Sequence, residues 1–288
     1  MTKKNYGAAT EKAIGEVVDA CERYGSQSIV AISGVPGTGK SFIASIAAQR
    51  FANEPLLVRE IQFHQSFSYE EFIEGLRIDD TSGVTVTPGV FLDWNQQALD
   101  DPGRRYVLLI EEFTRANLAA VLGELMTYLE HRERPFISVY SRKAVFVAKN
   151  LTILTTFNPR DRTAIDLDDA LIRRLRIIRF SPSPEQLQEM LKGAGLAPQV
   201  IVMLQDLFTK CKERFPDDYE HLMPFGHGIF AGVKSEIPDL FHLWRQRIEH
   251  LLRRPLIEPH PYTEAIEQLY PWRNESYKLD AANPNQSP

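Results

Sequence analysis

The chain has few of the features that mark secreted, membrane-spanning or metal-stapled proteins. Its 288 residues include two cysteines, Cys21 and Cys211, which are far apart and in no C-x-x-C pair, so neither a disulfide framework nor a cysteine metal site is expected. No apolar run approaches the roughly 18 residues that a membrane-spanning helix needs. Residues 1–5 lead into an amphipathic rather than an apolar segment, so we expect no membrane partner and a cytoplasmic location.

An excess of positive charge is also absent. The net charge is −5, from 33 Lys and Arg against 38 Asp and Glu, which argues against a protein that coats nucleic acid through its overall charge. Any contact with DNA must therefore be local. Arginines cluster at 173–179 and at 245–254, and the second cluster is either the solvated face of a helix, which we favour, or a phosphate-binding patch. The sequence has no internal repeat and no nuclease motif.

Short apolar runs alternate with helical patterns in a chain whose 43% hydrophobic and 25% charged residues are typical of a soluble globular protein. This alternation indicates an α/β fold over residues 1–180, with a doubly wound parallel sheet covered by helices. Helical spacing predicts one helix over 10–24, with Thr10 as N-cap, and another from Lys40 onward. The predicted strands are residues 28–33, 56–62, 105–110, 151–156 and 176–180.

The composition changes after residue 180. A Ser-Pro-Ser-Pro-Glu linker ends in a helix start, with Ser183 as N-cap and Pro184 at the first helical position. Helical patterns then predict a smaller all-helical domain, a lid over residues 181–270. Residues 271–288 have too little apolar content to pack, so we expect a flexible tail. The predicted lid helices are residues 185–194, 198–214 and 238–254.

A phosphate-binding loop joins the first predicted strand to the helix that follows. Residues 34–41 read Gly-Val-Pro-Gly-Thr-Gly-Lys-Ser and match G-x-x-x-x-G-K-[ST]. Glycines let the backbone N–H groups turn inward around phosphates, and the helix N-terminus adds partial positive charge. Lys40 can reach the β- and γ-phosphates, and the Ser41 hydroxyl can ligate Mg²⁺. The alternative, a chance match in a glycine-rich turn, is disfavoured by the strand and helix on either side. The predicted nucleotide-binding residues are Gly34, Val35, Pro36, Gly37, Thr38, Gly39, Lys40, Ser41 and Phe42.

Two acids follow the apolar strand that begins at Tyr106. They are Glu111 and Glu112, and the carboxyl ends of parallel strands line the ligand crevice of an open α/β sheet. This pattern predicts a Walker B site in which Glu111 holds Mg²⁺ through water and Glu112 polarises the attacking water. A solvated turn is the alternative, and the phosphate loop upstream makes the functional interpretation the better one.

Further polar groups complete the predicted catalytic set. The strand at 151–156 leads to Asn158, which can orient the water or contact the γ-phosphate as sensor 1, although alone it would indicate a turn. Arg174, with Arg173 as the alternative, is predicted to act as an arginine finger on the nucleotide of a neighbouring subunit, which requires oligomerisation. The predicted catalytic residues are thus Lys40, Glu112, Asn158, Arg173 and Arg174.

The phosphate loop, the two acids, Asn158 and the arginine pair follow one another along the chain in this order. These four elements resemble those of an AAA+ ATPase of the helix-2-insert group, which includes MoxR-like and dynein-related members. A narrower resemblance, over residues 28–256, is to the McrB family, the motor subunit of McrBC restriction systems. The segment at 62–75, Gln-Phe-His-Gln-Ser-Phe-Ser-Tyr-Glu-Glu-Phe-Ile-Glu-Gly, is the most specific. The other matching segments are Glu-Glu-Phe-Thr-Arg-Ala-Asn at 111–117, Phe-Gly-His-Gly at 225–228 and Leu-Trp-Arg at 243–245.

The resemblance implies an oligomeric machine. It implies β-hairpin inserts near 81–91 and 137–147, which in such proteins face a ring pore or a partner; extra edge strands are the structural alternative. It implies a hexameric ring with Mg²⁺ and ATP, or GTP, that remodels or translocates DNA or a partner nuclease in phage defence. A McrC-like activator or nuclease would be the partner. The alternatives are a MoxR-type chaperone ATPase that matures a protein partner without a nucleic-acid role, and a scaffold that does not hydrolyse its nucleotide.

Some residues depart from the McrB pattern. Glu111 stands in place of Asp, and Thr114 in place of Asn. The sensor segment at 158–161 reads Asn-Pro-Arg-Asp rather than Asn-Thr-Ala-Asp, which leaves the base preference open. His227 stands where many AAA+ lids have a sensor 2 arginine, so a direct contact from the lid to the γ-phosphate is not expected. Within the 62–75 segment, Ser68 to Glu71 form a capping-box pattern that predicts a short helix.

Overall fold

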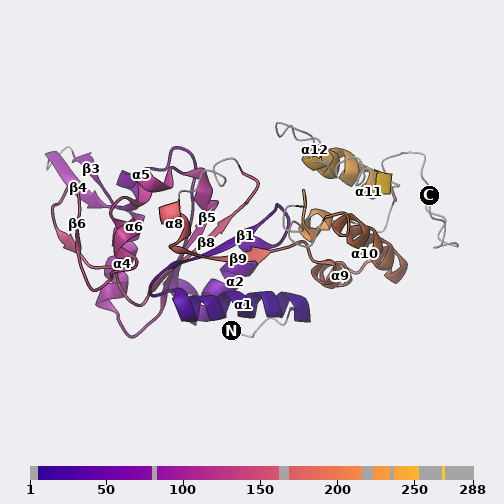
Figure 1. Ribbon diagram of the computed structural model, residues 1–288, viewed down its shortest axis with the longest axis horizontal. Coiled ribbons are helices and arrows are strands. Elements are labelled where there is room, and N and C mark those ends of the chain that lie inside the picture. The colour runs from indigo at the N-terminus through magenta and orange to yellow at the C-terminus, as the bar shows by residue number, and fades with distance from the viewer. Residues whose placement is uncertain are drawn as a thin grey trace. The chain divides into compact units, whose positions relative to one another are not determined.

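The computed structural model describes residues 6–79, 83–161, 169–215, 223–233, 237–252 and 268–269 (Figure 1). The chain divides into two compact units. The sheet unit comprises Lys12–Ser33 and Lys40–Arg179, and the lid unit comprises Met1–Glu11, Gly34–Gly39 and Phe180–Pro288. The phosphate loop and the start of the first helix thus group with the lid unit, although the sequence assigned both to the sheet domain.

Five strands form the sheet, in the order β2-β5-β8-β1-β9. Parallel pairing joins β2 to β5, β5 to β8 and β8 to β1. Every residue of β1, β5 and β8 is buried, as expected for central strands covered on both faces. The predicted α/β fold with a parallel sheet is confirmed. The strands are β1 (Ile29–Gly34), β2 (Val58–Gln62), β5 (Tyr106–Glu111), β8 (Leu151–Phe157) and β9 (Leu175–Phe180).

Helices pack around this sheet, with α2 against β5 and β8, and α4 against β5 (Figure 1). Among the described residues, no helix has both the length and the apolar character that crossing a bilayer would take. A short 3₁₀ turn, η1 (Pro55–Leu57), precedes β2, and another, η2 (Phe113–Arg115), follows β5. The helices of the sheet are α1 (Ala8–Tyr24), α2 (Lys40–Ala52), α4 (Val90–Asp100), α5 (Leu118–Leu122), α6 (Leu125–Tyr128) and α8 (Asp169–Ile172).

The first helix, α1, begins earlier than predicted. Thr10 lies inside the first turn rather than at the N-cap, because α1 starts at Ala8. Its free N–H groups are satisfied by Glu189, whose carboxylate accepts hydrogen bonds from Ala9 N at 2.7 Å and Thr10 N at 3.2 Å. The Thr10 hydroxyl donates to the same carboxylate at 2.8 Å. A residue distant in sequence therefore supplies the cap, and a negative charge there also favours the helix dipole.

Two β-hairpins extend the sheet unit. The first pairs β3 (Glu74–Asp79) with β4 (Gly83–Pro88) in antiparallel register, so it begins before the predicted 81–91 segment, which supplies only its second strand. Residues 80–82 lie outside the described residues. The predicted hairpin at 137–147 is reduced to two short strands, β6 (Phe136–Ile137) and β7 (Ala144–Val145). Before β3, the predicted capping box starts α3 (Tyr69–Phe72), with both of its hydrogen bonds present.

One buried carboxylate joins the base of the first hairpin to the turn of the second. Glu74, at the start of β3, accepts hydrogen bonds from Tyr140 N at 2.7 Å and from Ser141 N at 2.9 Å. The hydroxyl of Tyr140 donates to Glu70 at 2.7 Å. Because a buried carboxylate needs such partners to compensate its lost hydration, this contact fixes the turn of the second hairpin on the first.

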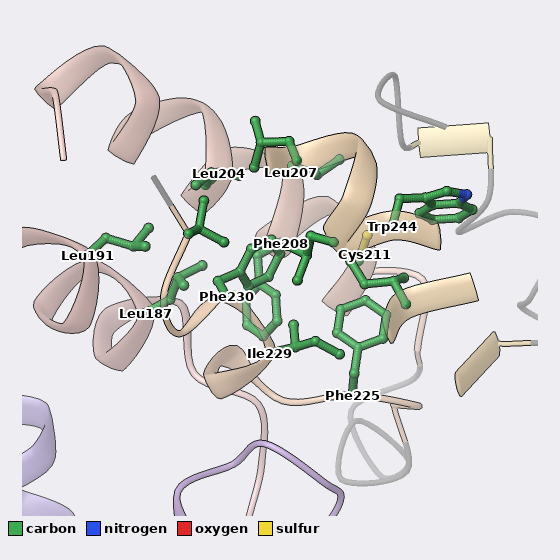
Figure 2. Packing of buried hydrophobic residues seen from close by; sticks show 14 of the residues in the cluster. Leu187, Leu191, Leu204, Leu207, Phe208, Cys211, Phe225, Ile229, Phe230 and Trp244 are labelled. Carbon is green, nitrogen blue, oxygen red and sulfur yellow. The ribbon is translucent and has the colours of Figure 1, made fainter. Parts of the chain in front are cut away.

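The lid unit has its own hydrophobic core (Figure 2). Phe208 lies at its centre, with ring centroids 6.2 Å from Phe225 and 6.0 Å from Phe230. The predicted N-cap Ser183 accepts a hydrogen bond from Gln186 N at 3.1 Å, with Pro184 at the first helical position. The predicted tail, residues 271–288, lies outside the described residues. The lid elements are α9 (Pro184–Gly193), α10 (Pro198–Lys212), η4 (His227–Phe230), α11 (Ile237–Leu243), the π-helical turn η5 (Trp244–Ile248) and α12 (Glu249–Leu252).

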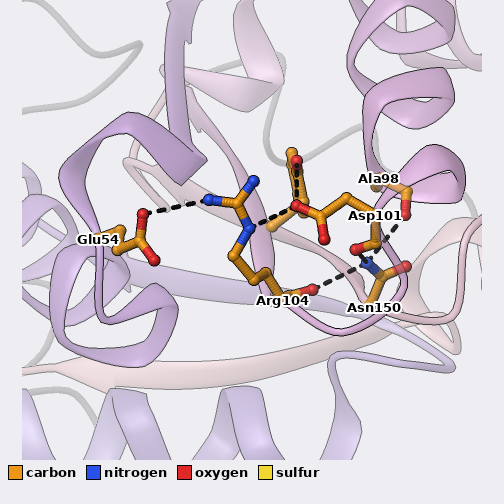
Figure 3. A network of polar contacts seen from close by, with 6 residues as sticks. Glu54, Ala98, Asp101, Arg104 and Asn150 are labelled. Atoms are coloured by element: carbon orange, nitrogen blue, oxygen red, sulfur yellow. Dashed lines mark hydrogen bonds and ion pairs between the residues drawn. The ribbon is translucent and has the colours of Figure 1, made fainter.

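A polar junction closes the sheet unit at the start of β8 (Figure 3). The Asn150 side-chain nitrogen lies 3.0 Å from the carbonyls of Ala98 and Asp101 and 2.8 Å from that of Arg104. Arg104 also forms ion pairs with Asp101 and Glu54. One amide, with two N–H groups, is thus shared among three carbonyls between the end of α4 and the start of β5.

We expect Asn150→Ala to lower the free energy of unfolding by about 1–3 kcal/mol, because it removes the amide that joins these three carbonyls. Gln96→Ala is the matched control, since that exposed amide bonds one side chain, Asp100. Urea unfolding at equilibrium measures both. Equal midpoints for the two variants would contradict the role given to Asn150.

Candidate active site

The phosphate loop connects β1 to α2. Gly37 and Gly39 have φ values of 81° and 77°, in the left-handed region that residues with a Cβ rarely adopt. Thr38 is buried, and its hydroxyl donates to the carbonyl of Val35 at 2.9 Å, which closes the turn from inside. The loop therefore holds its curvature through its own backbone and one side chain.

Lys40 and Ser41 occupy the first turn of α2, as the motif predicts. Burial lowers the pKa of Lys40, and the charges of Glu112, Glu111 and Asp161 act in the opposite direction. The lysine therefore faces a group of carboxylates at the carboxyl ends of the strands. Phe42, also predicted to contact nucleotide, is half exposed on the same turn.

Glu111 is the last residue of β5, and its side chain is buried. One carboxylate oxygen, Oε2, accepts hydrogen bonds from Ser41 Oγ at 2.8 Å and from Thr156 Oγ1. The other oxygen, Oε1, is buried and has no hydrogen-bond partner among the described residues. An unsatisfied carboxylate oxygen beside a serine hydroxyl is the kind of oxygen donor set that suits Mg²⁺, which takes one or two protein carboxylates and completes its shell with phosphate and water. These residues fit the predicted metal.

Glu112 follows in an unusual backbone conformation. Its φ and ψ are 54° and 41°, which is the left-handed region in a residue other than glycine. Its carboxylate lies 2.9 Å from Nε of Arg115, and Arg115 N donates to the Glu112 carbonyl at 2.9 Å. Arg115 was not among the predicted site residues, although an acid followed by a base three positions later in a tight turn is a recognisable signal.

Asn158 lies one residue beyond the end of β8 and is buried. Its amide nitrogen donates to Asp161 at 3.1 Å, and its amide oxygen accepts from Arg160 N at 3.1 Å. The side chain therefore shapes the 158–161 turn. Thr156, two residues earlier and also missed by the sequence analysis, is the β8 residue that contacts Glu111.

The two candidate finger arginines differ in their surroundings. Arg174 is buried, with Nε 3.2 Å from a Glu130 carboxylate oxygen and Nη1 donating to the Ala170 carbonyl at 2.6 Å. Arg173 is exposed. Arg174 is thus engaged within its own chain, whereas the Arg173 side chain has no hydrogen bond or ion pair among the described residues, and the choice between them as a finger remains a prediction.

Within the lid unit, the phosphate loop is bonded to η4. Gly226 N donates to the Pro36 carbonyl at 2.7 Å, and Gly228 N donates to the Gly37 carbonyl at 2.6 Å. A Cβ at Gly226 would lie 2.4 Å from the Gly37 carbonyl, so this approach requires glycine. The first turn of η4 thus binds two carbonyl groups of the loop.

A cavity of about 580 Å³ borders the loop at the same place. Its polar residues were not among the predicted site residues, and the arginine cluster that includes Arg247 was interpreted as the solvated face of a helix in preference to a phosphate-binding patch. Arg247 is exposed, as that interpretation expects, and its Nη1 also lies 3.3 Å from the Ile229 carbonyl. The lining residues are Pro36, Gly37, Gly228, Ile229, Gln246, Arg247, His250 and Leu251.

His227 presents no positive charge to this region. It is buried between the two glycines, and Ser183 N donates to its Nδ1 at 3.4 Å. Burial lowers the pKa of His227 to about 4, and the charge of Glu189 opposes this shift only in part. The imidazole is therefore neutral near pH 7, which agrees with the expectation that it does not replace a sensor 2 arginine.

A glycine-rich loop between a buried parallel strand and a helix, with a lysine, a serine and strand-end carboxylates around it, defines the P-loop nucleoside triphosphatases. Within this class, residues 29–175, just over half of the chain, match the model of the AAA domain, dynein-related subfamily. The chain belongs to this family and is an NTP-hydrolysing ATPase.

Two curated relatives come from restriction systems. The chain is 29% identical over 260 residues to the Type IV methyl-directed restriction enzyme EcoKMcrB subunit of Escherichia coli (strain K12), covering 85% of this chain and 56% of that protein. It is 24% identical over 185 residues to the Type II restriction enzyme BsuMI component YdiS of Bacillus subtilis (strain 168), covering 50% and 54%. The chain therefore spans about half the length of these relatives. The predicted kinship with AAA+ ATPases close to McrB is confirmed.

The low pKa of His227 predicts a pH-dependent stability. Its folded pKa, about 4, lies below the ordinary value of 6.5, so the unfolded chain binds more protons between these values. The contribution of neutral His227 to the free energy of unfolding is therefore complete above pH 6.5. About 3 kcal/mol of it is lost as the pH falls towards 4. Urea unfolding at pH 7 and pH 4.5 should show a smaller loss for His227→Gln than for the wild type. His64→Gln, a change at an exposed histidine, should lose as much free energy of unfolding between the two pH values as the wild type does.

Proposed function

We propose that this chain is a Mg²⁺-dependent AAA+ motor that assembles into a hexameric ring and couples hydrolysis to remodelling or translocation of DNA or of a partner nuclease, in phage defence. In this proposal residues 1–180 form the motor core and residues 181–270 the lid, in the cytoplasm. The observation that carries the hydrolytic part is the cluster of Ser41, Glu111 and Thr156, with one buried carboxylate oxygen left unsatisfied.

Each residue of the site has a distinct task in this reaction. Lys40 and the loop N–H groups bind the phosphates, while Ser41 and Glu111 hold the metal. Bound Mg²⁺ would neutralise charge that develops on the phosphates. Glu112 polarises the attacking water, and Asn158 fixes the turn beside it. The reaction needs no covalent intermediate, so positioning and charge supply its acceleration.

A neighbouring subunit would complete the site through Arg173. Its guanidinium is exposed, whereas that of Arg174 is held by Glu130. An arginine supplied in this way can contribute about 10³ to 10⁵ in rate. Hydrolysis would then depend on assembly. In the proposed ring, the nucleotide site of each subunit would lie next to Arg173 of the neighbouring subunit.

The first hairpin supports contact with another molecule. Leu76 is paired with Val86 and Ile78 with Val84, so four apolar side chains lie on one face of the hairpin. All four are exposed, Ile78 to 87%. The two relatives are a subunit and a component of restriction enzymes, which supports a McrC-like activator or nuclease as the partner, with DNA as a further candidate.

The same hairpin face favours one alternative function. It is apolar rather than basic, and an apolar surface suits a protein better than a phosphate backbone. A MoxR-type chaperone ATPase that matures a protein partner without a nucleic-acid role is therefore the second candidate. Stimulation of turnover by DNA or by a McrC-like subunit would favour the first function over this one.

The cavity beside the loop supports ATP as the nucleotide, with GTP as the alternative. Gln246 lines it and has no hydrogen-bond partner among the described residues, and a carboxamide matches the N6/N7 edge of adenine. A guanidinium matches guanine O6/N7, but that of Arg247 is directed to the carbonyls of Ile229 and Ala231, at 3.3 and 3.4 Å. The donor that guanine would need is thus already engaged.

Turnover of the purified chain with ATP and with GTP, with and without a McrC-like subunit, tests the proposal. We expect Glu112→Gln to lower kcat by about 10²- to 10⁴-fold with nucleotide binding retained, because the water loses its polarising carboxylate. Lys40→Ala should lose binding as well. Glu16→Gln, at an exposed carboxylate on α1, is the control. Absence of turnover under every condition would refute the motor function.

Base selection is tested at the cavity. We expect Gln246→Ala to raise KM for ATP about tenfold and to leave KM for GTP nearly unchanged, because one bidentate contact to adenine is lost. Arg245→Ala alters the preceding residue, which does not line the cavity, and should change neither value. Equal effects of Gln246→Ala on both nucleotides would refute the assignment to adenine.

A further inference from the structure

We propose that Arg115 is a positioning residue for the proposed hydrolysis: its guanidinium holds the Glu112 carboxylate at the place from which it polarises the attacking water. The inference rests on the proposed function, because it gives Arg115 no role outside this reaction. Arg115 would act through Glu112 and would not itself touch the nucleotide.

The backbone of the turn is fixed without help from the Arg115 side chain. Phe113 and Thr114 are buried, and the Phe113 ring stacks on Phe63 with 5.8 Å between centroids. Phe63 N donates to the Glu111 carbonyl at 2.9 Å, so β2 and the residue before the turn are also joined. These contacts hold Glu112 in its left-handed conformation, which would otherwise be unfavourable.

The side chain of Glu112 is less constrained than its backbone. It is partly exposed, and among the described residues the partner shown for its carboxylate is Arg115 Nε at 2.9 Å. A glutamate has three rotatable bonds, so a fixed backbone alone leaves its carboxylate several positions. The ion pair to Arg115, which projects from the same rigid turn, selects one of them.

The selected position leaves Glu112 in electrostatic contact with Lys40. Burial lowers the pKa of Lys40, and the charge of Glu112 is the largest of the three that oppose this shift, ahead of Glu111 and Asp161. The Glu112 carboxylate therefore acts on the charge of Lys40, the proposed phosphate-binding lysine, while it is paired with Arg115. The pair keeps the carboxylate at the site rather than drawing it away.

Steady-state kinetics and nucleotide binding of Arg115→Ala test this role. We expect kcat to fall at least tenfold and the nucleotide Kd to stay within twofold of the wild type, because the binding groups lie in the loop and not in this turn. Arg115→Lys should recover part of kcat, since an ammonium keeps the charge but not the planar fork. Adding Arg115→Ala to Glu112→Gln should cause no further loss, because the two residues act as a unit.

Arg104→Ala is the matched control (Figure 3). Arg104 makes the same kind of contact, from Nε to a carboxylate three residues earlier, and its side chain is 50% exposed, compared with 52% for Arg115. This pair lies at the start of β5, at the opposite end of the strand from Glu111. We expect kcat to remain within twofold of the wild type.

The outcomes separate the inference from the function. If the wild type hydrolyses nucleotide and Glu112→Gln does not, an unchanged kcat in Arg115→Ala overturns the inference alone. A higher kcat in Arg115→Ala overturns it too, since Arg115 would then restrain Glu112. If the wild type does not hydrolyse nucleotide, the proposed function fails and the inference fails with it. Arg115→Gln, which keeps the length of the side chain, gives the same readouts if the alanine variant does not fold.

Discussion

The buried carboxylate of Glu111 is the constraint on which the arrangement of the site depends. A carboxylate removed from water must be compensated by hydrogen bonds or a cation, and here Ser41 and Thr156 supply the hydrogen bonds to one oxygen. These partners come from α2 and β8, so satisfying one charge sets the distance between the helix that follows the phosphate loop and two neighbouring strands. The second oxygen is buried and has no hydrogen-bond partner among the described residues, which is why we propose it as a metal ligand.

The parallel sheet makes this convergence possible. β5 and β8 pair in register, with Ile110 beside Thr155, so their carboxyl ends bring Glu111 and Thr156 together although 45 residues separate them. The same edge carries the turn of Glu112 and the turn of Asn158. Rigid strands thus deliver the polar groups, while tight turns orient them, which is how one sheet edge can combine a metal site with a water-activating group.

Sequence motifs identified the loop, Lys40, Ser41, Glu111 and Glu112 because these functions require particular residue types at fixed spacing next to strands. Contacts between distant segments could not be inferred in this way. Thr156 gives no local signal, since a threonine in a strand is ordinary, and the capping of α1 by Glu189 joins segments 179 or more residues apart. The first hairpin was misplaced because its first strand, β3, follows the capping box directly and carries no turn signal of its own.

The sequence by itself determined the α/β class, the nucleotide chemistry and the family, since periodicity, glycines and charged residues at set positions are properties of short segments. The tertiary structure alone decided which side chains are free to act. It placed Arg174 in an ion pair with Glu130, left Arg173 exposed, directed Arg247 to carbonyls of the lid and joined Arg115 to Glu112. Burial and pairing depend on the neighbours that folding brings together, and two adjacent arginines in a sequence carry no information about those neighbours.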